Sequence, residues 1–201
     1  MRSILPLCLA LAAPLTAMPA IAATAPAASI PAGRYVMDKD HRKLLWSVDH
    51  FGFSAYYGHF TGLDGTLMLD PAKPAASSVE VTIDINSIST DNATLQTELK
   101  SADWFDAAKF PTATFKSTKV VPGANGHAKV TGNLTLHGVT KPVTLDVTLH
   151  GAGMHPMMKV ETVGFDAKTT INRSEFGITK FAPMISDKVD LTFSAEFHLA
   201  K

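Results

Sequence analysis

The sequence predicts an all-β protein, folded as a closed antiparallel barrel or, as the alternative, a β-sandwich. In several segments every second residue is apolar, and short turn-like segments join them. The clearest is 128–149, in which apolar residues alternate with polar ones on both sides of a break at 138–142. Successive strand side chains point to opposite faces, so this segment is a hairpin with one apolar face. A hairpin alone is marginally stable and needs further strands against that face.

The first part of the chain supplies four such strands. Residues 34–37 and 44–52 are predicted to be separate strands, and a third runs through 67–69. Residues 79–85 alternate Val and Ile with Glu, Thr and Asp, which is typical of a half-buried strand. In the second strand His50 shares a face with Leu44, Trp46 and Val48, so an imidazole points inward if that face is the interior.

One short helical insertion follows the fourth strand. Residues 92–100 contain good helix formers, with Leu95 and Leu99 four positions apart and Asp91 or Asn92 as the N-cap. Residues 101–106 are predicted to form a second short helical turn, which ends before Pro111.

The alternation resumes after the insertion and continues to the C-terminus. Strands are expected over 113–121, the two arms of 128–149, 163–171 and 189–199, with a hairpin turn at Asn125-Gly126 and a loop over 151–159. The total is eight or nine antiparallel strands. Closing them into a barrel removes exposed sheet edges and leaves an interior that holds side chains or one slender ligand.

The N-terminal segment is predicted to be an export signal rather than part of the fold. A positive start, an apolar run and an Ala20-Ile21-Ala22 site indicate a signal peptide over 1–22, followed by a flexible leader over 23–33 and the barrel domain over 34–201. The only cysteine, Cys8, lies within the signal, so the mature chain is expected to lack disulfides. We expect a periplasmic or secreted protein.

Charge and patterning exclude two classes of protein. The formal net charge is zero, which disfavours nucleic-acid binding. An outer-membrane barrel also alternates, but its membrane band needs apolar residues outside. Here the outward positions of the last strand carry Asp190, Thr192 and Glu196, and nothing after the signal is long and apolar enough to cross a bilayer as a helix.

No motif for catalysis, metal or cofactor binding stands out. The chain lacks HExxH, paired CxxC, GxSxG and phosphate-loop patterns, so we expect no enzyme and no cofactor. The closest to a metal site is Met154-His155-Pro156-Met157-Met158, whose thioethers suit copper(I). The alternative is an apolar loop at the barrel rim.

Three polar or aromatic features are candidates for a ligand site. His50 is either a hydrogen-bonded core residue or a group that orients a ligand in an apolar pocket. Arg173 either forms a structural ion pair with Glu175 or Asp187, or binds an anion at the barrel mouth. An aromatic group after the helix either plugs one barrel end or lines an apolar entrance: Trp104, Phe105 and Phe110.

The chain also resembles the YceI-like family over nearly its whole mature length. The resemblance lies in HRKLLWSVDHFGFSAYYGHF at 41–60, LKSADWFDAAKFP at 99–111, GNLTLHGVTKPVTL at 132–145, and INRSEFGI and ISDKV between 171 and 189. It differs at Arg42, where family members often have serine. The resemblance implies an eight-stranded, lipocalin-like barrel that binds a polyisoprenoid, such as a quinone or prenyl-phosphate lipid, without any established catalysis.

Combining the resemblance with the inward faces gives a predicted lining for the ligand channel. It comprises Trp46, Val48, Phe60, Ile83, Phe105, Phe115, Leu134, Phe165, Ile171, Phe176 and Phe193, with His50 and Arg173 for the head group. Two alternatives stay open: a filled-core periplasmic stress or interaction protein, and a barrel enzyme that uses His50 on a hydrophobic substrate. The oligomeric state is open, a homodimer included.

Overall fold

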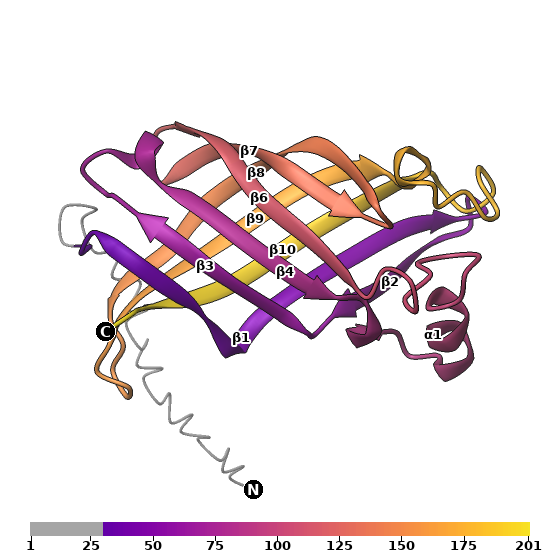
Figure 1. Cartoon of the computed structure of the whole chain (residues 1–201), viewed down its shortest axis with the longest axis horizontal. Coiled ribbons are helices and arrows are strands. Elements are labelled where there is room, and N and C mark those ends of the chain that lie inside the picture. Colours follow the sequence, from indigo (N-terminus) through magenta and orange to yellow (C-terminus); the bar gives the residue numbers. More distant parts are fainter. Residues whose placement is uncertain (1–29) are drawn as a thin grey trace, which may run out of the picture.

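The computed structural model describes residues 30–201, and all strands of this part of the chain belong to one antiparallel sheet (Figure 1). The predicted signal peptide and Cys8 lie outside the described residues, as does most of the predicted leader. The strands are β1 (Gly33–His50), β2 (Ser54–Phe60), β3 (Leu63–Leu69), β4 (Ser78–Asp84), β5 (Ile88–Ser89), β6 (Thr112–Pro122), β7 (His127–Leu136), β8 (Val139–Met154), β9 (Glu161–Asn172) and β10 (Lys188–Leu199).

The sheet closes on itself because β10 pairs with β1 as well as with β9. Around the ring the order is β1, β3, β4, β6, β7, β8, β9, β10, so the barrel has eight strands. β2 and β3 pair with successive parts of β1 and together occupy one position. The predicted barrel is confirmed, and the sandwich alternative is wrong because the ring has no open edge between two sheets.

The predicted separation of 34–37 from 44–52 is wrong, since both belong to the single long strand β1. Its pairing with β10 shifts between Met37 and Arg42, a bulge at which the strand bends (Figure 1). Buried side chains fall at Tyr35 and Met37 before the bulge and at Leu44 and Trp46 after it. The bulge therefore changes which set of alternate residues faces inward, and this looks like a strand boundary in the sequence.

The helical insertion lies at one end of the barrel (Figure 1). Helix α1 (Ala93–Leu99) begins after Asn92, whose side chain accepts a hydrogen bond from the Leu95 backbone N–H at 3.0 Å, confirming the predicted cap. Residues 101–106 form hydrogen-bonded turns rather than the predicted helical turn. Residues 30–201 also contain three short 3-10 helices: η2 (Pro74–Ala76), η3 (Ile85–Ser87) and η4 (Arg173–Phe176).

The hairpin turns follow the sequence expectations, with two changes of boundary. The predicted break at 138–142 is too long, because β7 ends at Leu136 and β8 begins at Val139. Asn125 and Gly126 both have positive φ, 55° and 76°, as the tight hairpin turn between β6 and β7 requires. The predicted loop over 151–159 is too long, because β8 continues to Met154 and pairs with β9 through Glu161. A bulge between Leu149 and Gly151 interrupts the alternation there and hides the rest of the strand.

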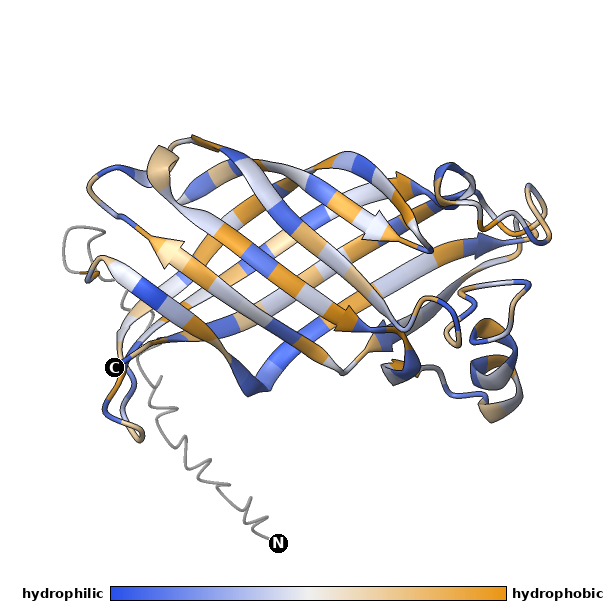
Figure 2. Ribbon diagram, viewed as in Figure 1, coloured by the Kyte–Doolittle hydropathy of each residue, from blue (hydrophilic) through white to orange (hydrophobic). Residues whose placement is uncertain are grey.

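Alternation along the strands gives the barrel an apolar interior and a polar exterior (Figure 2). The largest fully buried side chains come from β1, β3, β9, β10 and the 3-10 helices η3 and η4: Tyr35, Leu63, Ile85, Val163, Phe176 and Phe197. The exterior carries cross-strand ion pairs such as Lys116–Glu80 and Lys129–Asp146. Within residues 30–201 no helix has the length and apolar character needed to span a membrane.

Candidate ligand-binding cavities

The barrel interior contains two cavities placed end to end. Their volumes are about 370 and 360 Å³, each within the range of roughly 300–1,000 Å³ typical of small-molecule sites. Both are lined by Leu44, Ile83, Leu134 and Leu191, so they meet at this layer of side chains. The interior is therefore not completely filled, which disfavours the filled-core alternative.

The first cavity extends to the barrel end that carries the β3–β4 and β6–β7 turns. Its walls are aliphatic and aromatic side chains from the inward faces of β3, β4 and β6 to β10, with Ile30 and Pro74 near the end. Five predicted lining residues lie on it: Ile83, Phe115, Leu134, Phe165 and Phe193.

The second cavity extends to the end covered by α1. Nine of the predicted residues line it, two of them shared with the first cavity: Trp46, Val48, His50, Phe60, Ile83, Phe105, Leu134, Ile171 and Arg173. The two head-group candidates, His50 and Arg173, thus face the same space although 123 positions separate them in the chain.

Phe176 differs from the other predicted residues. It is 1% exposed but lines neither cavity, because η4 turns its side chain into the packed end of the barrel. Its carbonyl oxygen pairs with the His137 imidazole at 3.0 Å. Phe176 is therefore placed as a core residue.

Several lining residues were not predicted from the sequence. Tyr56 lies on β2, and Leu95, Glu98 and Leu99 reach the second cavity from α1. The pattern of β2 signals Tyr56, since it shares a face with Phe60. Nothing in the sequence indicates which face of an insertion covers a barrel end.

Arg173 is held by backbone carbonyls rather than by an acid. Its Nε, Nη1 and Nη2 donate to the carbonyl oxygens of Ser186, Ile178 and Ile185 at 3.0, 3.0 and 2.8 Å. The predicted ion pair with Glu175 or Asp187 is wrong: Glu175 accepts from the Asn172 amide, and Asp187 accepts from Ser174.

The guanidinium of Arg173 brings a positive charge to the second cavity. It is 5% exposed and stacks on the Trp104 ring at 5.5 Å. Burial lowers the pKa of Arg173, and the nearby charge of Asp187 partly opposes that effect. An arginine keeps its charge in proteins, so the cavity wall contains a largely desolvated cation without a direct carboxylate partner.

His50 and Trp46 add two further polar groups to this wall. The His50 ring lies edge-on to Phe51 at 4.4 Å and near Tyr56 at 6.5 Å. The buried indole nitrogen of Trp46 has no hydrogen-bond partner within residues 30–201. Leaving a buried N–H unpaired costs about 1–3 kcal/mol, so a polar ligand atom beside it would be favoured.

Helix α1 and the turns after it cover the end of the second cavity, and ion pairs hold them to the β9–β10 loop. The Trp104 indole N–H donates to Glu98 at 3.1 Å, and the Lys180 ammonium reaches Glu98 at 3.3 Å and Asp103 at 2.9 Å. The hydrogen bond to Asp103 raises the pKa of Lys180; desolvation opposes this, and Glu98 adds to it. Trp104 and Phe105 line the cavity, whereas Phe110 packs on His137 outside it.

The methionine-rich loop lies apart from both cavities. The His155 Nδ1 accepts backbone N–H groups of Met157 and Met158 at 3.3 and 3.1 Å, and the Met157 side chain is 86% exposed. This imidazole nitrogen stabilises the loop, and copper(I) binding there stays a prediction.

Comparison with known proteins agrees with this architecture. A YceI-like domain is matched over residues 35–197, which cover the whole ring of strands. The chain belongs to the YceI-like family. Protein YceI of Salmonella arizonae is 41% identical over 170 residues, covering 84% of this chain and 88% of that protein.

Solved structures of other proteins share the barrel. BcnA of Burkholderia cenocepacia superposes with a TM-score of 0.72 at 29% identity, covering 80% of this chain and 98% of that one. A polyisoprenoid-binding domain of Saccharophagus degradans has a TM-score of 0.63 at 15% identity, covering 85% and 100%. The second likeness shows the common fold.

Proposed function

We propose that this YceI-like protein is a carrier that binds one polyisoprenoid, of the quinone or prenyl-phosphate type, or a similar long-chain lipid. The observation that carries the proposal is the pair of apolar cavities that meet inside the closed barrel. A ligand that fills both must be long, slender and mostly hydrocarbon. The Saccharophagus degradans domain named for polyisoprenoid binding supports the idea that a barrel of this fold accommodates such a chain.

Burial of the prenyl chain supplies the binding energy. Each buried CH₂ contributes about 0.8 kcal/mol, so a five-carbon unit contributes about 4 kcal/mol before the cost of ordering the chain. The lining of the first cavity is mostly aliphatic and aromatic, with Val143, Leu145 and Phe193 among its residues, so it suits a hydrocarbon tail.

In this proposal the head group of the lipid binds in the second cavity. Arg173 supplies a cation there, and His50 and the unpaired indole N–H of Trp46 supply hydrogen-bonding groups. An anionic phosphate or a quinone carbonyl complements these donors. The tail then crosses the layer of Leu44, Ile83, Leu134 and Leu191 into the first cavity.

The proposed compartment follows from the N-terminal sequence. A cleaved signal over 1–22 directs the barrel to the periplasm or the exterior, where a long isoprenoid is almost insoluble in water and needs a covering protein.

Reconstitution tests this function directly. Delipidated protein is mixed with a prenylquinone and with a prenyl phosphate of the same tail length, and complexes are counted by native mass spectrometry. We expect one lipid per chain for at least one of them and no complex with the matching head group without a tail. Absence of a complex with both lipids contradicts the proposal.

The same mixture reports the orientation of the ligand. Both tryptophans of the chain, Trp46 and Trp104, line the second cavity. A bound quinone head group should therefore quench most of the intrinsic fluorescence in a saturable way. Full quinone binding without quenching would place the head group at the opposite end.

A further inference from the structure

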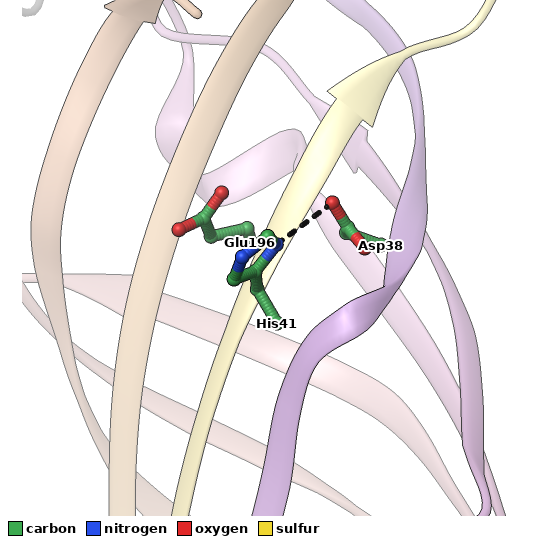
Figure 3. Close-up of side chains that lie close together, drawn as sticks. All are labelled: Asp38, His41 and Glu196. Atoms are coloured by element: carbon green, nitrogen blue, oxygen red, sulfur yellow. Dashed lines mark hydrogen bonds and ion pairs between the residues drawn. The ribbon is translucent and has the colours of Figure 1, made fainter.

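The outer wall of the barrel carries a cluster of two carboxylates and two imidazoles that neither cavity reaches. Asp38 and His41 lie in the bend of β1, and Glu196 lies on β10 (Figure 3). His198 also lies on β10, and it and Glu196 alternate with the inward-facing Phe197. Ligand atoms of Asp38, His41 and Glu196 all lie within 4.8 Å of one another. His198 adds its Nε2, 2.7 Å from the Asp38 Oδ2.

Both imidazoles converge on a single oxygen of Asp38. The His41 Nδ1 lies 3.1 Å and the His198 Nε2 2.7 Å from Oδ2, while Oδ1 accepts the backbone N–H of Asp40 at 2.6 Å. The Asp38 side chain is only 7% exposed, so this carboxylate is fixed in position. Tetrahedral zinc with ligands at about 2.0–2.1 Å has neighbouring ligand atoms about 3.3 Å apart, so the spacing between His41 and Asp38 needs only a small adjustment.

A hydrogen bond between the Nδ1 of His198 and the Thr162 hydroxyl fixes the orientation of the imidazole ring. The Thr162 hydroxyl donates to the Val160 carbonyl at 3.2 Å, so its oxygen accepts from the His198 Nδ1–H at 2.9 Å. The other ring nitrogen, Nε2, faces the Asp38 carboxylate at 2.7 Å, so His198 fixes the position of that ligand. A ligating group that a neighbouring side chain holds in place by a hydrogen bond is the usual arrangement in metal sites.

We propose that Asp38, His41 and Glu196 form a binding site for a divalent transition metal of the zinc type, with His198 orienting the Asp38 carboxylate. One imidazole and two carboxylate ligands, with a water in the fourth position, suit such an ion. His41 is 56% exposed, so the ion reaches the site from solvent. The bound ion links β1 to β10 where their pairing is interrupted, and thereby stabilises the bend. This inference is independent of the lipid-carrier proposal.

Zinc titration of the untagged full-length chain, as exported by its host, tests the site. Chelator-treated protein competes with a chromophoric zinc chelator, and melting temperatures are recorded with and without zinc chloride. We expect one tight site per chain and a higher melting temperature with zinc. Asp38→Asn risks unfolding, so the decisive variants are His41→Ala and Glu196→Gln, each expected to weaken binding on the order of 10- to 100-fold.

The matched control is His150→Ala. The His150 Nδ1 also lies 2.9 Å from an aspartate, Asp166, but this pair belongs to no three-ligand group within residues 30–201. Zinc affinity of the control should equal that of the parent. Absence of tight zinc binding overturns the site, and so does unchanged affinity in both decisive variants when their metal-free melting temperatures match the parent.

Discussion

The indole ring of Trp46 on β1 lies directly against Gly58 on the paired strand β2. A Cβ at Gly58 would lie 2.2 Å from Cζ2 of Trp46, too close for any real contact. The absence of a side chain at Gly58 therefore allows this ring to lie flat against the wall of the second cavity.

Replacing Gly58 with alanine should displace Trp46. We expect Gly58→Ala to lower the free energy of unfolding by about 1–3 kcal/mol, the usual cost of overpacking, and to shift the tryptophan emission maximum. Urea unfolding and fluorescence measure both effects. Gly164→Ala on β9 is the control, since its nearest neighbour would be an ordinary contact at 3.8 Å; equal behaviour of the two variants would contradict the close packing.

The layer shared by the cavities should limit the length of the ligand. Leu191→Phe adds bulk where the cavities meet, so long prenyl chains should bind at least about tenfold more weakly, while a chain short enough for one cavity keeps its affinity. Binding of a tail-length series measures this. Leu45→Phe on the outer face, where Leu45 is 45% exposed, should have no effect. An equal loss at every tail length would mean that the cavities are not used together.

Arg173 should be structurally irreplaceable by lysine. The ammonium keeps the charge but cannot donate to three carbonyls in the fixed geometry of the guanidinium. We expect Arg173→Lys to destabilise the fold by about 1–3 kcal/mol in urea unfolding. Arg34→Lys on the exposed side of β1 should be neutral, and a neutral Arg173→Lys would show that these hydrogen bonds contribute little.

The contacts of Lys180 should slow ligand exchange. Lys180→Met removes the ion pairs to Glu98 and Asp103 that fasten the segment over the second cavity. Lipid should then dissociate several-fold faster, with the affinity less affected, as measured by transfer to acceptor vesicles. Lys119→Met, on an exposed position of β6, is the control. Identical dissociation rates in the two variants would show that lipid does not leave past α1.

Asp166 should stabilise the barrel only while it is ionised. A hydrogen bond from Ser194 lowers the pKa of Asp166 below its ordinary value of 3.8; partial burial opposes this, and His150 adds to the lowering. A depressed folded-state pKa means that the stabilisation is present above pH 3.8 and is lost as the pH falls through the lower value. The melting temperature of Asp166→Asn should therefore lie below that of the parent at pH 7 and approach it in acid. A difference that is the same at every pH would contradict the assignment.

The sequence predicts the barrel well where alternation is uninterrupted. Along β10, and along β9 except at Thr169, every second residue is apolar and faces inward, so Phe165, Ile171 and Phe193 could be placed in the interior without coordinates. Prediction fails at the bulges, where an odd number of extra residues exchanges the two faces. Because of that exchange, the single strand β1 looks like two strands in the sequence. For the same reason the sequence gives no sign that Asp38 and His41 lie close to Glu196.

The hydrogen-bond partners that come from distant segments also could not be predicted from the sequence. Glu175 and Asp187 lie close to Arg173 in the chain, yet the guanidinium bonds carbonyls of the β9–β10 loop, whose path depends on tertiary packing. Phe176 lies in a segment that resembles the family and was predicted to line the channel, but it belongs to η4 and lines neither cavity. Neither outcome is contained in local periodicity.

The two cavities together should hold one long-chain lipid. Mass spectrometry of an organic extract tests this, using protein purified gently from its native host. We expect a stoichiometric prenyl or similar long-chain lipid, absent from a mock purification and from folded Phe193→Lys protein. A blank extract from well-folded parent protein, or the same lipid content in the Phe193→Lys variant, would contradict it.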